Sequence, residues 1–217
     1  MTYPPIHCLT VDGLAVSHTE QVRSLCAAGA RMIQVRMKQA EHDAVVRVAH
    51  ECRPICRNAG SLLIVNDHLE AALEAGADGV HLGKNDRPWE AARALAGPDF
   101  LIGGTVNSLA DAERAASCGV LDYAGVGPYR FTRTKERLAE VLSEADWAAI
   151  LECLGDLPSY AIGGIGLDDL RAVRALGLHG VAVCSSILAE DPEVIQTNYK
   201  SLAAAWEGTE SERISQS

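Results

Sequence analysis

Short apolar segments alternate with alanine-rich, charged segments along nearly the whole chain, and this alternation restricts the possible folds more than any other feature. A short apolar run between polar or glycine residues is typical of a strand that is buried on both faces. Eight such runs predict strands over Ile6–Val11, Met32–Met37, Leu62–Val65, Gly79–Leu82, Leu101–Val106, Tyr123–Val126, Tyr160–Ile165 and Gly180–Cys184.

The segments between these runs have the composition of helices. They predict helices over Thr19–Ala28, Glu41–Asn58, Leu69–Ala75, Trp89–Leu95, Leu109–Cys118, Glu144–Leu154, Leu167–Leu176 and Glu193–Trp206. Several helix ends lead through a glycine into the next strand, as in AAGARMIQV, EAGADGVHL, SCGVLDYAGV and ALGLHGVAV. Glycine suits this place because it adopts the left-handed conformation that ends many helices.

Strands that alternate with helices predict a parallel sheet, and eight such units close naturally into a (β/α)8 TIM barrel, an α/β fold. A doubly wound open sheet is the alternative. The barrel is favoured because the units number eight and because polar residues gather at the strand ends, where a barrel builds its site. The 217 residues fit a single domain over 1–207, followed by a polar tail over 208–217 that we expect to fray.

The formal net charge of −10 argues against a broad surface for nucleic acid or a membrane, since both need clustered cations. The amino terminus lacks a signal-peptide pattern, and no window holds the roughly 18 to 20 apolar residues that span a bilayer. Seven cysteines without zinc-type pairs suit reduced thiols in a reducing compartment. We therefore expect a cytoplasmic protein that acts on small molecules, and the sequence leaves a homo-oligomer open.

Cations and an amide follow the second predicted strand. Alternation along a strand sends Gln34, Arg36 and Lys38 to the same side, where they could hold an anion. Arginine and lysine at a strand end are also often simply solvated, so this segment alone does not decide between the two interpretations.

Carboxylates follow the third and fourth predicted strands. Asn66 and Asp67 end the third strand, and Asp86 lies in the loop after the fourth. Magnesium is typically held by one or two carboxylates together with phosphate oxygens, so this pair suits a metal ion that is bound to a substrate phosphate. The alternative is that each aspartate caps the helix that follows it.

Two further loops have the composition of anion sites. The loop after the sixth strand, GPYRFTRTK, carries hydroxyls at Thr132 and Thr134 and a cation at Lys135, and could close over a phosphate. Glycines follow the seventh strand and serines the eighth, where barrels often bind phosphate through backbone N–H groups. We therefore expect two anion sites, one with a divalent metal at strands two to four and one without metal at strands seven and eight.

The motifs IQVRMK, VND, ADGVHLGKND, DYAGVGPYRFTRTK, AIGGI and GVAVCSSI stand in the order and spacing seen in thiamine phosphate synthases. The chain resembles this family from about Ile33 to Pro192. The resemblance implies a transferase that joins 4-amino-2-methyl-5-hydroxymethylpyrimidine diphosphate to 4-methyl-5-(2-phosphoethyl)thiazole, with Mg²⁺ as cofactor. Pyrophosphate departs first, and the thiazole nitrogen then captures the pyrimidine carbocation to give thiamine phosphate.

The resemblance also implies roles for individual residues. As catalytic cations on the diphosphate it points to Arg36, Lys38 and Lys135. As metal ligands it points to Asp67 and Asp86. As substrate-binding residues it points to Gln34, Asn66, Thr105, Thr132, Thr134, Gly164 and Ser185, of which the last two fall where the family binds the thiazole phosphate.

The chain departs from the family pattern at several positions. Lys84 stands where the family usually has glutamine, and its partner cannot be named from the sequence. Thr105 replaces a serine and keeps the hydroxyl, whereas Asn107 replaces a histidine. The stretch TKERLAEVLSEADW also lacks the family's glycine. The Arg-Phe form of the loop after the sixth strand and the Gly-Gly-Thr form of the fifth strand resemble a divergent branch of the synthases.

Other functions are weighed against the synthase. A thiazole tautomerase shares the fold and needs no metal, but its catalytic histidine would fall at Asn107, which cannot carry a proton at neutral pH. A phosphate-binding barrel of another pathway and a catalytically silent barrel that only binds thiamine precursors are further alternatives. His81, on the fourth strand, is interpreted as a core histidine rather than a base.

Overall fold

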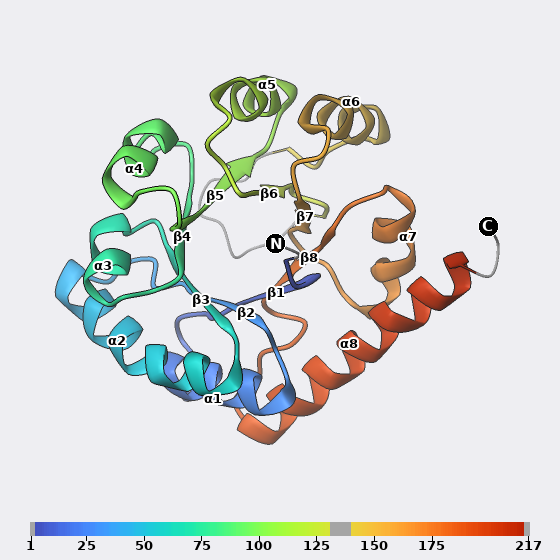
Figure 1. Cartoon of the computed structure of the whole chain (residues 1–217). Helices are drawn as coiled ribbons and strands as arrows, with labels where there is room; N and C mark the ends of the chain where they lie inside the picture. The colour runs from blue at the N-terminus through green and yellow to red at the C-terminus, as the bar shows by residue number, and fades with distance from the viewer. Residues whose placement is uncertain (1–2, 131–139, 215–217) are drawn as a thin grey trace.

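The computed structural model describes residues 3–130 and 140–214. In this part of the chain, eight parallel strands form a closed barrel in the order β1 to β8, and β8 pairs with β1. Figure 1 shows the strands at the centre and the helices around them. The predicted (β/α)8 barrel is therefore confirmed, because β1 and β8 would not pair with each other in an open sheet.

Each strand is short. The strands are β1 Ile6–Leu9, β2 Met32–Val35, β3 Leu62–Asn66, β4 Gly79–Leu82, β5 Leu101–Val106, β6 Tyr123–Val126, β7 Ser159–Ile162 and β8 Gly180–Val183. All eight correspond to predicted strands, but β1, β2 and β7 end before the predicted Val11, Met37 and Ile165. Beyond these strand ends, side chains or turns replace the backbone hydrogen bonds of the ladder.

The helices lie where the composition predicted them. They are α1 His18–Ala28, α2 His42–Ala59, α3 Leu69–Glu74, α4 Trp89–Ala96, α5 Leu109–Cys118, α6 Glu144–Leu154, α7 Leu170–Ala175 and α8 Pro192–Ile214, with a short 3-10 helix, η1, over Leu167–Asp169. The predicted end at Trp206 is wrong, because α8 continues to Ile214 through a segment that contains no proline and several good helix formers.

Glycine ends the helices as the sequence predicted. Gly29, Gly76, Gly119 and Gly177 all have positive φ, between 62° and 98°. After α1, the Gly29 amide donates to the carbonyl oxygen of Cys26, which closes the helix end. This turn brings the chain directly into β2.

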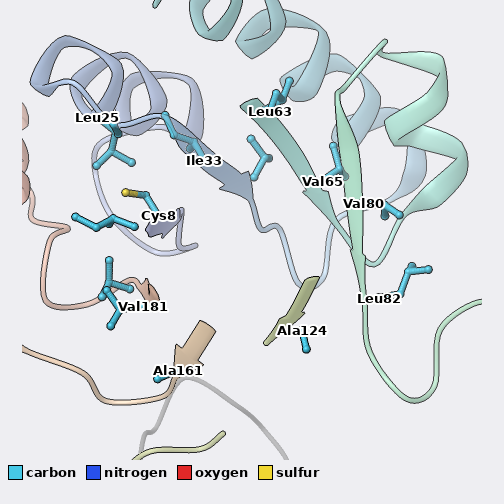
Figure 2. Close-up of a cluster of buried hydrophobic side chains, with 14 of the residues drawn as sticks. Cys8, Leu25, Ile33, Leu63, Val65, Val80, Leu82, Ala124, Ala161 and Val181 are labelled. Atoms are coloured by element: carbon cyan, nitrogen blue, oxygen red, sulfur yellow. The ribbon is translucent and has the colours of Figure 1, made fainter. Parts of the chain in front are cut away.

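The larger part of the core lies between the barrel wall and the helices. Along each strand the outward-facing residues are small or branched apolar side chains that pack against helix residues such as Leu25. Figure 2 shows this layer, with Cys8, Ile33, Val65, Val80 and Val181 among its members. The alternation of the strands thus buries one set of side chains outside the barrel and leaves the other set inside it.

The interior of the barrel holds a smaller cluster of apolar and aromatic side chains. Leu9, Met32, Ile64, Leu101, Tyr123, Tyr160 and Ala182 form it. Glycines make room for the larger rings, since a Cβ on Gly103 would lie 2.1 Å from the Tyr123 ring and one on Gly125 would lie 3.1 Å from His81.

All seven cysteines are free thiols. No helix in the described ranges is both long enough and apolar enough to cross a bilayer.

We expect Gly103→Ala to destabilise the barrel, because the added methyl group would collide with the buried Tyr123 ring. Overpacking of this kind costs about 1–3 kcal/mol, and each kcal/mol lowers the Tm by about 2–4 °C in a chain of this size. Thermal unfolding followed by circular dichroism would measure the effect.

Gly208→Ala is the matched control, because Gly208 lies in α8 and a Cβ there would meet no atom within 4 Å. This variant should keep or slightly raise the Tm, since alanine favours helix over glycine. Equal Tm values for the two variants would contradict the packing of Tyr123 against Gly103.

Candidate functional site

The carboxyl ends of the eight strands meet at one end of the barrel, which we call the carboxyl rim. Parallel strands in a closed barrel leave no other possibility, so residues that are distant in the sequence become neighbours here. Most of the residues predicted from the strand ends lie at this rim, whereas Gln34, Asn66 and Thr105 lie deeper.

An acidic pair occupies the rim at β3 and β4. The carboxyl groups of Asp67 and Asp86 share a hydrogen bond, and restricted hydration at the barrel mouth together with the charge of Asp86 raises the pKa of Asp67 to about 7. Asp67 also has a φ of 63°, which is uncommon for a residue other than glycine. The two carboxyl groups are therefore held close together, sharing a proton when Asp67 is protonated and repelling each other when both are ionised.

Neither aspartate is a helix cap. The N-cap of α3 is His68 and that of α4 is Pro88, and neither helix has a side-chain hydrogen bond at its cap. Asp86 instead accepts a hydrogen bond from the Gly83 amide at 2.6 Å, which fixes the loop after β4. The alternative that these residues only cap helices is therefore excluded by the structure.

The donor set of this pair fits a hard divalent cation. Two carboxylates without histidine or thiolate suit Mg²⁺, which takes its remaining ligands from water and phosphate. In the described part of the chain, no cluster of three or more histidine, cysteine, aspartate or glutamate side chains could hold a metal by itself. A metal held by this pair would take its remaining ligands from water or from a phosphate.

Glycines line a small cavity at the ends of β7 and β8. Its volume is about 60 Å³, and it is lined by Leu9, Arg36, Ile162, Gly163, Gly164, Ile165, Ala182, Val183, Cys184 and Ser185. Gly163 and Gly164 have φ of 107° and 68°, and a Cβ on Gly163 would lie 3.0 Å from Pro128. The two glycines contribute only backbone to the wall of this cavity, as in many barrel phosphate sites, beside apolar residues and the polar residues Arg36 and Ser185.

Arg36 connects the two regions that the sequence treated as separate anion sites. Arg36 lines the glycine cavity. Its positive charge also lowers the pKa of Asp67, although restricted hydration and the charge of Asp86 raise that pKa by more. Arg36 therefore lies near both the acidic pair and the glycine cavity. Half-buried Lys38 lies further out, in a hollow with Asp12, Gln39 and Ala40.

Other predicted residues lie deeper in the barrel. Gln34 is buried, and its amide nitrogen is 3.3 Å from Nε2 of His7, a ring that burial keeps neutral by lowering its pKa to about 3. Asn66 is buried beside Asp67 and forms a hydrogen bond with it. Gln34 is not among the residues that line the glycine cavity, so the structure places it below the rim.

Thr105 joins a chain of hydrogen bonds through the barrel. Its hydroxyl lies 3.0 Å from Nε2 of His81, and Nδ1 of His81 lies 3.3 Å from the Tyr123 hydroxyl. His81 is 8% exposed, which agrees with its interpretation as a core histidine. The hydrogen bond with His81 thereby orients the Thr105 hydroxyl from the barrel interior.

The structure supplies a partner for Lys84. Its ammonium group is 2.7 Å from a carboxylate oxygen of Asp111 at the start of α5, and the same oxygen accepts hydrogen bonds from the Asn107 amide and the Ser108 hydroxyl. The side chain of Asn107 donates to the Gly127 carbonyl oxygen. Asn107, where a tautomerase would need histidine, therefore binds backbone.

The sequence signal S-x-x-D at Ser108 marks the start of a helix, but it does not reveal that Asp111 also binds Lys84. The predicted ligands Thr132, Thr134 and Lys135 lie outside the described residues. The last described residue before them, Arg130, forms an ion pair with Asp169, which also accepts from the Gly166 amide beside the glycine cavity.

Comparisons with known proteins show the family to which the chain belongs. The family model of thiamine monophosphate synthase matches residues 8–187. The chain is 43% identical over 169 residues to a thiamine-phosphate synthase of Bacteroides thetaiotaomicron, covering 76% of this chain and 80% of that protein. It is 40% identical over 181 residues to a thiamine-phosphate synthase of Bacteroides fragilis, covering 81% and 88%.

A solved structure is similar along almost the whole chain. The thiamine phosphate pyrophosphorylase from Pyrococcus furiosus superposes with a TM-score of 0.83 at 32% identity, covering 94% of this chain and 96% of that one. The similarity thus includes both sequence and barrel geometry.

Asp67→Asn should stabilise the metal-free protein at pH 8, because it removes one of two charges that repel each other. The raised pKa means that the folded state binds this proton more tightly than the unfolded chain does, so metal-free stability falls as the pH rises through about 7. Since Asp67 is exposed at the rim, screening limits the expected gain in Tm to about 1–3 °C.

Differential scanning calorimetry in EDTA at pH 5 and pH 8 would measure this effect. The gain in Tm of Asp67→Asn over wild type should be larger at pH 8 than at pH 5. A lower Tm for the variant at pH 8 would show that the two carboxylates do not repel each other in the folded protein.

Proposed function

The chain belongs to the thiamine monophosphate synthase family and is a thiamine-phosphate synthase, and from this premise we propose which substrates it uses and how its residues act on them. The substrates are 4-amino-2-methyl-5-hydroxymethylpyrimidine diphosphate and 4-methyl-5-(2-phosphoethyl)thiazole. The observation that supports this assignment best is the position of Arg36 between the acidic pair and the glycine cavity. One site thereby offers a place for a diphosphate and a place for a phosphate.

The diphosphate would lie at the acidic pair. Asp67 and Asp86 would hold Mg²⁺, which when bound supplies positive charge that neutralises the leaving diphosphate. Arg36 and Lys38 would hold the same group from β2, and the buried amide of Asn66 would orient Asp67. Lys135, Thr132 and Thr134 are proposed, on the resemblance alone, to complete this site from the loop after β6.

The thiazole phosphate would lie in the glycine cavity. Gly164 and Ser185 line it and would contribute a backbone amide and a hydroxyl, and the guanidinium of Arg36 adds charge. Thr105 and Gln34 would contact the pyrimidine ring from the barrel interior. This arrangement would place the thiazole nitrogen opposite the carbon that carries the diphosphate.

The reaction would then proceed by ionisation. The carbon–oxygen bond breaks and the pyrophosphate leaves with the electron pair, after which the thiazole nitrogen forms a bond to the pyrimidine carbocation. Such a reaction needs stabilisation of the leaving negative charge more than it needs a general base. The neutral His7 and the backbone-bound Asn107 agree with a site that transfers no proton in this step.

Arg36→Ala should lower kcat/KM for thiamine phosphate formation by about 100-fold or more, because it removes a charge that stabilises the leaving diphosphate. Steady-state kinetics with both substrates and Mg²⁺ would measure this. Arg57→Ala is a control, since Arg57 is exposed in the last turn of α2, at the opposite end of the barrel from the rim. Unchanged turnover in Arg36→Ala would remove the diphosphate assignment.

Asp86→Asn should raise the Mg²⁺ concentration needed for half-maximal activity by about tenfold or more, because a charged ligand is lost. Magnesium titrations of activity would test this, together with the Mg²⁺-induced shift in Tm, which needs no turnover. The control is Asp99→Asn, since Asp99 lines a separate hollow near Leu101 at the start of β5. Identical magnesium titrations for wild type and Asp86→Asn would exclude Asp86 as a ligand.

A further inference from the structure

The hydrogen-bond ladder between β1 and β2 stops just before the two cations that follow β2, Arg36 and Lys38. Its last backbone hydrogen bond at this end runs from the Thr10 amide to the Gln34 carbonyl oxygen at 2.9 Å. Arg36 and Lys38 follow this point, so their backbone N–H groups need other partners.

Side chains from the end of β1 continue the ladder. The Arg36 amide donates to the Thr10 hydroxyl at 3.0 Å, and the Lys38 amide donates to Oδ2 of Asp12 at 3.0 Å. The two acceptors have the same spacing of two residues as the two donors. The backbone amides of Arg36 and Lys38, which lies in a turn, are thus both held by side chains that follow β1.

A histidine from α1 connects these two acceptors. Nδ1 of His18 lies 2.7 Å from the Thr10 hydroxyl, and Nε2 lies 3.0 Å from Oδ1 of Asp12. With the proton on Nε2, the ring donates to Asp12 and accepts from the Thr10 hydroxyl, which leaves the Thr10 oxygen free to accept from the Arg36 amide. Both ring nitrogens of His18, the Thr10 hydroxyl and the Arg36 amide then each have a hydrogen-bond partner.

The same helix turn also holds the residue between the two acceptors. The side chain of Gln21 accepts from the Val11 amide at 3.0 Å and donates to the Val11 carbonyl oxygen at 3.0 Å. His18 and Gln21 are three residues apart and therefore lie on the same face of α1. The first turn of α1 thus clamps the end of β1 at three consecutive residues.

We propose that His18, Thr10 and Asp12 are positioning residues for the reaction, because together they place the backbone of Arg36 and Lys38 so that both cations reach the diphosphate. The inference rests on the proposed role of those two cations. The Asp–His–Thr order resembles a catalytic triad, but Thr10 is fully buried and its oxygen already accepts from Arg36, so it is no nucleophile.

The test measures binding of the reaction product, inorganic pyrophosphate with Mg²⁺, by isothermal titration calorimetry, together with KM for the pyrimidine diphosphate and kcat. Thr10→Val keeps the shape but leaves the Arg36 amide without an acceptor, and should raise both the Kd and the KM by about tenfold. Thr10→Ser keeps the hydroxyl and should restore both to within about threefold of wild type.

His18 is tested in the same way. His18→Ala should weaken pyrophosphate binding, whereas His18→Gln should largely restore it, because the glutamine amide can donate to Asp12 and accept from Thr10. His42→Ala is the matched control, since His42 forms a similar pair with Glu74 at 3.2 Å on the outside of the barrel. Its pyrophosphate binding should equal that of wild type.

The outcomes separate this inference from the proposed function. If Arg36→Ala binds Mg²⁺–pyrophosphate as wild type does, the diphosphate site itself is wrong. If Arg36→Ala loses binding while Thr10→Val and His18→Ala keep it, only the positioning role is overturned. A lower Tm with an unchanged Kd in Thr10→Val and His18→Ala would likewise show a purely structural role.

Discussion

Closure of the parallel hydrogen-bond ladder is the constraint on which the rest of this structure depends. All eight strand pairings are parallel, so every strand points the same way and all carboxyl ends meet at one rim. The wall then has two faces, an outer one packed against helices and an inner one that must be filled. Glycines at Gly103 and Gly125 allow that filling, since they leave space for the rings of Tyr123 and His81. The interior is thereby closed below the rim, and chemistry is restricted to the rim.

The rim concentrates charges that would repel each other without a ligand. Asp67 and Asp86 are held in contact, and the glycine cavity offers backbone of Gly163 and Gly164 at its wall. Arg36 lies between these two parts. A site of this kind is built for charge that arrives with the substrate, which agrees with a reaction that separates a diphosphate anion from a carbocation. The contacts of α1 with the chain after β1 would support this site, because they hold the backbone that carries Arg36 and Lys38.

Sequence patterns predicted the strands and helices well, because their alternation reports which faces are buried. They predicted ends less well: β2 stops at Val35 because side chains of β1 replace its ladder, and α8 continues past Trp206 because polar helix formers follow. The patterns also left the aspartates between metal ligands and helix caps. The structure excluded the caps by placing His68 and Pro88 at those positions.

The sequence by itself determined the barrel, the family and the residue types that gather at strand ends, since periodicity and local motifs are properties of neighbouring residues. Only the tertiary structure decided which of these residues meet. It joined two expected anion sites through Arg36, gave Lys84 its partner in Asp111, and connected His18 to the backbone of β2. Such contacts depend on the curvature of the closed wall and on the direction of each side chain. Those quantities are set by packing across the whole barrel, and no local segment of the sequence contains them.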